Sequence, residues 1–207
     1  MPATDWAPWA ARHCSTLSHH GTDCCVTARA WFLAMDRSHW RGQGAPSWIR
    51  RRYEWGPTRW PLHWCEAVDA EELCCGAHAA LSIEAFRGRG IDALPAQLVQ
   101  RYQTHDVPHW HSRWTRGGAN PEWASGGFAY HEVCAVIDDG RLSVWNPTAT
   151  AWVSPDHRSG YTSIAAIRVQ HPSPDERTVT WGSLALPLGV WTSTADASTS
   201  DVVAVAR

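Results

Sequence analysis

The chain contains no lysine, and all 18 of its basic residues are arginines. This absence excludes enzymes that need a Schiff-base lysine, the lysine of a phosphate-binding loop or the strand lysine of protein kinases. Nothing in the sequence resembles the apolar run of about 20 residues that a membrane-spanning helix requires. The formal net charge of −2 gives no general attraction to nucleic acid or to an anionic membrane. We therefore expect neither as a partner.

The composition predicts a folded protein. Hydrophobic residues make up 44% of the 207 residues and charged residues 18%, which is typical of a domain with a full core. The seven cysteines are an odd number and include the vicinal pairs Cys24-Cys25 and Cys74-Cys75. Together with the lack of a recognisable signal peptide, this pattern favours reduced thiols and a cytoplasmic location.

The sequence pattern predicts one catalytic domain over residues 1–170. Its first part, 1–70, is rich in tryptophan, and its second part, 71–170, carries the chemistry-bearing residues; 171–207 is expected to be a partly flexible C-terminal extension. Apolar periodicity and turn residues predict the following elements: helices at 24–35 and 71–89, strands within 91–102 and 161–170, and a long polar loop over 104–127.

A β-hairpin is predicted between Tyr130 and Trp145. Two β-rich runs flank Asp139-Gly140, a pair typical of a type I′ turn. With these two residues as the loop, His131 and Asn146 lie on the same face as diagonal neighbours. Their β-carbons are then about 7 Å apart or slightly less, which lets an asparagine side chain reach an imidazole ring.

Cys75, His131 and Asn146 are the candidate catalytic residues. Cys75 opens a helix-like segment within 71–89, and the positive end of the helix dipole is expected to stabilise its thiolate and lower its pKa. His131 is expected to take the thiol proton and later protonate the leaving group. Asn146 is expected to fix the orientation and tautomer of the imidazole. A nucleophile, a base and an orienting group are the minimum set for covalent catalysis on a carbonyl.

The stretch from Cys75 to Trp152 resembles the catalytic core of the transglutaminase-like superfamily. There the cysteine begins a helix, with an alanine four positions on and a Gly-Ile turn fifteen positions on, as Ala79 and Gly90-Ile91 stand here. The histidine begins a strand, and the next strand ends in Trp-Asp-Pro-Thr, which is Trp145-Asn146-Pro147-Thr148 in this chain. The asparagine departs from that family and is instead similar to papain-like peptidases.

The resemblance implies an α+β fold in which a helix bearing Cys75 packs on an antiparallel sheet bearing His131 and Asn146. It implies acyl transfer through a thioester on Cys75, in which an acyl or aminoacyl group passes to an amine. The alternatives are amide hydrolysis by a peptidase or amidase, and a non-catalytic binding protein with a degenerate site. The expected partners are a small-molecule or peptide acyl donor, an amine acceptor and, for transfer, a carrier protein.

Each of these residues also has a structural interpretation. Cys75 fits a buried helix cysteine, and Asn146 fits a turn residue before Pro147. The basic stretch around Arg50-Arg51-Arg52 fits a solvated surface as well as a site for an anion. The 15 tryptophans fit an acyl pocket or general packing equally well. No cofactor and no metal are expected at Cys74, Cys75 and His78, because the spacing lacks a Cys-x-x-Cys pair.

Overall fold

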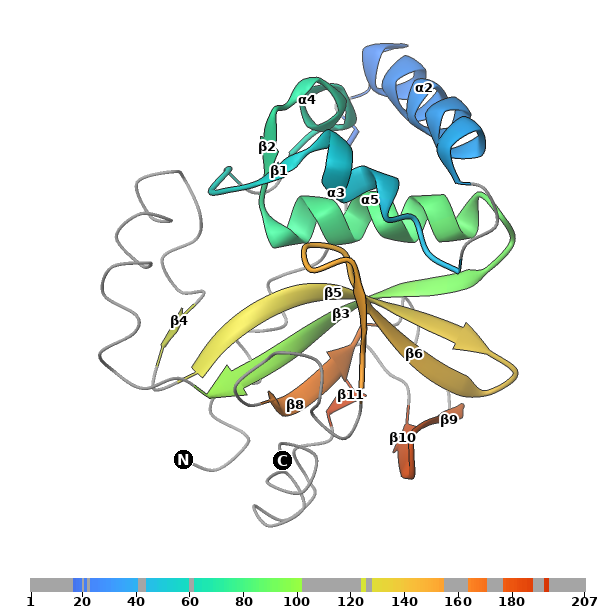
Figure 1. Ribbon diagram of the computed structural model, residues 1–207, viewed down its shortest axis with the longest axis vertical. Coiled ribbons are helices and arrows are strands. Elements are labelled where there is room, and N and C mark those ends of the chain that lie inside the picture. Colours follow the sequence, from blue (N-terminus) through green and yellow to red (C-terminus); the bar gives the residue numbers. More distant parts are fainter. Residues whose placement is uncertain are drawn as a thin grey trace.

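The computed structural model describes residues 17–19, 21, 23–40, 44–59, 62–101, 124–125, 128–154, 164–170, 177–187 and 192–193. Helices combine with a mainly antiparallel sheet, so the expected α+β class is confirmed (Figure 1). The helices are α2 (Asp23–His39), α3 (Trp48–Arg52), α4 (Trp64–Asp69) and α5 (Cys75–Arg87). The strands are β1 (Glu54–Trp55), β2 (Glu72–Leu73), β3 (Asp92–Arg101), β4 (Ala124–Ser125), β5 (Phe128–Asp138), β6 (Arg141–Asn146), β7 (Ala151–Val153), β8 (Ile164–Val169), β9 (Thr178–Trp181), β10 (Leu184–Pro187) and β11 (Thr192–Ser193).

Nine strands form the main sheet, whose central path runs β10-β9-β6-β5-β3-β8-β11. All of its strand pairs are antiparallel except β6 with β9, which is parallel. Off this path, β4 pairs with β5 and β7 pairs with β6, both antiparallel. The strands expected within 91–102 and 161–170 are β3 and β8. The segment 171–207, expected as an extension, contributes β9, β10 and β11 to this same sheet. Most of the predicted loop 104–127 lies outside the described residues.

The helices cover one face of the sheet. Helix α5 packs against β3 and β5, while α2 and α4 pack together on the far side of α5 from the sheet (Figure 1). One core cluster fills the space between helices and sheet, with Phe32, Leu81 and Phe86 among its buried side chains. A second cluster, which includes Val133, Val144 and Trp181, fills the opposite face of the strands. The sheet is therefore buried on both faces around its centre.

Helix α5 begins at Cys75, so the predicted helical opening at Cys75 is confirmed and the wider range that began at residue 71 is wrong. Glu72 and Leu73 instead form β2, which pairs in parallel with β1. Cys74 is the extended N-cap residue, and its N–H donates to Thr58 Oγ1 at 2.9 Å. At the other end, the left-handed Gly90 (φ 76°) lets the N–H of Ile91 reach Phe86 O at 3.1 Å, so the chain turns directly into β3.

The hairpin prediction is confirmed in its turn and in its register. Asp139 and Gly140 both have positive φ, 46° and 70°, as a type I′ turn requires. Asp138 pairs with Arg141, and the ladder runs in register to Cys134 opposite Trp145. This register carries His131 and Asn146 to the same face at the end of the pair.

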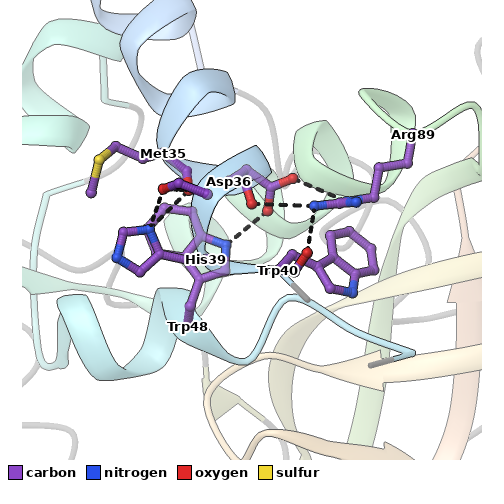
Figure 2. Close-up of polar contacts among 7 residues, drawn as sticks. Met35, Asp36, His39, Trp40, Trp48 and Arg89 are labelled. Atoms are coloured by element: carbon purple, nitrogen blue, oxygen red, sulfur yellow. Dashed lines mark hydrogen bonds and ion pairs between the residues drawn. The ribbon is translucent and has the colours of Figure 1, made fainter. Parts of the chain in front are cut away.

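A buried carboxylate, Asp36, joins three helical segments (Figure 2). Its Oδ1 accepts from Trp48 Nε1 at 2.8 Å, which connects α2 to α3. Its Oδ2 accepts from Arg89 Nε at 3.2 Å, just after α5, and the Arg89 guanidinium also lies 4.0 Å from the Trp40 ring centroid. Burial raises the pKa of Asp36, against the opposing effect of the Trp48 and Arg89 bonds. The network fixes α2 on α5.

Candidate active site

His131 and Asn146 meet at the end of the β5–β6 hairpin. His131 Nε2 lies 3.0 Å from Asn146 Oδ1, and both side chains are buried. Since an amide oxygen only accepts, the contact requires the proton on Nε2 when the ring is neutral. Nδ1, the ring nitrogen closer to the backbone of His131, is then the basic one.

Thr148 completes this contact, although its sequence position predicted no role for it. Its Oγ1 donates to Asn146 Oδ1 at 2.9 Å and lies 3.3 Å from His131 Nε2. Its backbone N–H also donates to Asn146 Oδ1, at 3.2 Å, as in an Asx turn. Asn146 therefore serves both as the turn residue before Pro147 and as a partner of His131. The Asn-Pro-Thr motif was the available signal for Thr148.

Cys75 places its sulfur beside the peptide group that joins His131 to Glu132. The N–H of Glu132 belongs to that peptide group, and its hydrogen bond to the Cys75 sulfur lowers the pKa of the thiol. Cys75 is also the first residue of α5, where the first N–H groups lack intrahelical acceptors and can hold an oxyanion. The thiol thus lies close to the backbone between His131 and Glu132.

Burial keeps both groups neutral. It raises the pKa of Cys75 well above its usual range, and the charges of Cys74 and Glu132 raise it further. These effects outweigh the bonds from the Glu132 and Gly76 N–H groups, so the expected lowering of the Cys75 pKa is wrong. Burial also lowers the pKa of His131, although its bond to Asn146 acts in the opposite direction. Burial therefore favours the thiol form of Cys75 and the neutral form of His131.

The neighbouring thiol, Cys74, has a different environment. It is buried, whereas Cys75 is partly exposed. Burial raises the pKa of Cys74, against hydrogen bonds from Ala77, Thr58 and Gly76. The contact with the 131–132 peptide therefore favours Cys75 as the nucleophile.

Trp55 is a second residue at this site for which the sequence predicted no role. Its ring meets the His131 ring edge-on, with centroids 6.4 Å apart, and its side chain is 41% exposed. It lies in β1, which pairs with the strand immediately before Cys74. No local sequence signal distinguishes it from the other tryptophans, because the contact depends on how β1 packs.

Two basic residues hold β1 and the Thr148 turn in place. His78 is fully buried in α5 and has one ring nitrogen 3.2 Å from Cys74 O and the other 3.3 Å from Tyr53 O. Burial lowers its pKa to about 4. Arg50 donates to Tyr53 O at 3.2 Å and to Thr148 O at 3.3 Å. Arg50 also lies 3.6 Å from the Glu54 carboxylate, so its partners are two carbonyl oxygens and a neighbouring side chain. The neutral His78 ring can donate to one of its two carbonyl neighbours.

No helix among the described residues is long and apolar enough to cross a membrane. A comparison of the chain with models of protein families, with curated proteins and with solved structures gives no match.

Proposed function

We propose that the protein is a thiol-dependent acyltransferase of the transglutaminase-like or papain-like type, with Cys75 as nucleophile. The observation that supports it most is the position of the Cys75 sulfur at the 131–132 peptide while Nε2 of His131 binds Asn146. The sulfur of the proposed nucleophile thus lies at the backbone of the residue that carries the proposed base. Cys75 is also at the start of α5, where oxyanion donors are available.

In the proposed reaction the thiol proton of Cys75 passes to Nδ1 of His131 while sulfur bonds to the donor carbonyl. Backbone N–H groups at the start of α5 hold the resulting oxyanion. Its collapse breaks the bond to the leaving group, which receives the proton from His131, and a thioester remains. An amine then attacks the thioester and gives up a proton to His131. The bond between the acyl group and sulfur breaks, the amide leaves, and the proton returns from His131 to the Cys75 sulfur.

Amine transfer is proposed over hydrolysis because of the apolar surface at the site. The exposed part of the Trp55 indole adjoins His131, and such a surface suits an apolar acyl group and limits the approach of water.

The test is acylation by p-nitrophenyl acetate, followed as a burst of p-nitrophenolate. We expect one acetyl group on Cys75, with the burst lost in Cys75→Ala and retained in Cys74→Ala. His131→Ala should slow acylation by about 10²–10⁴-fold, the usual contribution of a general base. Trypsin leaves Cys65, Cys74 and Cys75 in one peptide between Arg59 and Arg87, so fragmentation within that peptide must assign the label.

Adding a primary amine separates transfer from hydrolysis. A transferase converts the acetyl-enzyme to the amide faster as the amine concentration rises, whereas a hydrolase releases acetate at a rate independent of the amine. Equal labelling of Cys74 and Cys75, or no burst at all, contradicts the proposal and favours a binding protein.

A further inference from the structure

Three cysteines outside the candidate active site come together from two helices. Cys24 and Cys25 lie in the first turn of α2, and Cys65 lies in the first turn of α4. Their sulfur atoms all lie within 4.8 Å of one another. Figure 1 shows α2 and α4 next to each other above α5. The contact is non-local, so the sequence spacing alone did not reveal it.

The spacing of the sulfurs matches that of ligands around one metal ion. Cys25 Sγ and Cys65 Sγ are 3.8 Å apart. Tetrahedral sites with metal–sulfur bonds of about 2.3 Å place their sulfurs about 3.8 Å apart. Vicinal cysteines point in directions about 100° apart around a helix, but here the third ligand comes from a second helix and lies within reach of both.

Burial leaves the cluster open on one side. Cys25 is fully buried, Cys65 is partly buried and Cys24 is exposed. A site with three protein ligands and one accessible position suits an ion that keeps a water molecule or an external ligand.

When no cation is present, the neighbouring thiols disfavour the ionisation of Cys65. Burial, followed by the hydrogen bonds and charges of Cys24 and Cys25, raises the pKa of Cys65 to about 11. A bound cation reverses this balance because it replaces the thiol protons and neutralises the sulfurs. Binding should therefore release protons.

We propose that Cys24, Cys25 and Cys65 bind one thiophilic ion of the Zn²⁺ class as three thiolates, with the fourth position accessible to solvent. The ion would join the start of α2 to the start of α4. Because it binds the folded arrangement and not the unfolded chain, it would raise the melting temperature of the protein.

The test uses the full chain, reduced, stripped with a chelator and kept under anaerobic conditions. We expect one equivalent of Zn²⁺ to bind with release of protons and a rise in melting temperature. One equivalent of Cd²⁺ should produce the ultraviolet sulfur-to-metal charge-transfer band. Cys24→Ala is the more informative variant, because the Cys24 side chain is exposed and its removal leaves the core intact. Cys65→Ala is the second variant. Both should weaken Zn²⁺ binding at least tenfold and diminish the Cd²⁺ band.

Cys75→Ala is the matched control, because it removes a thiol outside the cluster and should leave the stoichiometry and the band unchanged. Unchanged binding in Cys24→Ala and Cys65→Ala, or loss of binding in Cys75→Ala, would overturn the proposal. The proposal would also be overturned if the reduced protein bound neither Zn²⁺ nor Cd²⁺ and if Cys25 and Cys65 formed a disulfide before reduction. Metal binding and acylation are measured separately, so each proposal can fail without the other.

Discussion

The Nε2 atom of His131 lies 3.0 Å from Oδ1 of Asn146, and this contact assigns different roles to the two ring nitrogens. It holds the Nε2 proton and leaves Nδ1 as the basic nitrogen of the neutral ring. Asn146 Oδ1 also accepts from the Thr148 N–H and hydroxyl, which fix the amide itself. The imidazole is therefore oriented by a short chain of hydrogen bonds that ends in a backbone turn.

Thr148 is predicted to act as a positioning residue. Thr148→Val removes the hydroxyl that donates to Asn146 and keeps the volume of the side chain. We expect the p-nitrophenyl acetate burst to slow about five- to tenfold, which corresponds to about 1 kcal/mol for a lost hydrogen bond. Thr148→Ser keeps the hydroxyl and should restore the rate. Equal losses in both variants would point to the methyl group and to packing instead.

The pH dependence of Cys75 alkylation should reflect its raised pKa. Because burial and the Glu132 charge both disfavour the thiolate, labelling by iodoacetamide should be slow near neutral pH and increase into the alkaline range. Glu132→Gln keeps an acceptor for Gln97 and removes the charge, so the Cys75 pKa should fall and labelling at a fixed pH should accelerate. Glu71→Gln, at an exposed carboxylate, is the control. If the rate of Cys75 alkylation did not change between pH 5 and 7, the thiolate would already be formed at pH 5. That result would contradict the raised pKa of Cys75.

The positions of His131 and Asn146 could be predicted because a local signal determines them. The Asp139-Gly140 turn sets the register, and the register places residues 131 and 146 on one face. The sign of the Cys75 pKa shift could not be predicted in this way. The helix start is visible in the sequence, but the burial that outweighs it comes from packing against β5.

The short strands, too, could not be predicted from local sequence signals. β1 and β2 contain two residues each, too few for a periodic pattern, and their pairing places Trp55 against His131. β9 joins β6 through a single parallel pair, Arg141 with Thr180, which no turn signal indicates. The three-thiol cluster likewise depends on how α2 packs against α4.

Asp36 is predicted to contribute to stability rather than to activity. Asp36→Ala leaves Trp48 Nε1 buried without its acceptor and removes the ion pair with Arg89 (Figure 2). We expect a loss of about 2–3 kcal/mol in the free energy of unfolding, measured by urea denaturation. Asp36→Asn keeps an oxygen for Trp48 and should lose less. An alanine variant as stable as the wild type would show that α2 is held by apolar packing alone.

Asn146→Asp tests the electrostatic role of the third residue. A carboxylate in place of the amide stabilises the imidazolium, so the pKa of His131, which burial lowers, should rise. His131 must be neutral to accept the thiol proton, and the acidic limb of the acylation pH profile should therefore move to higher pH. Asn146→Ala provides the control: it should reduce the rate by up to about 10²-fold through loss of orientation, without that upward shift.

The Asp variant should also be less stable, since Asn146 Nδ2 is buried without a hydrogen-bond partner and a charged oxygen would replace it. An acidic limb that stays in place would mean that residue 146 does not interact with His131 during catalysis.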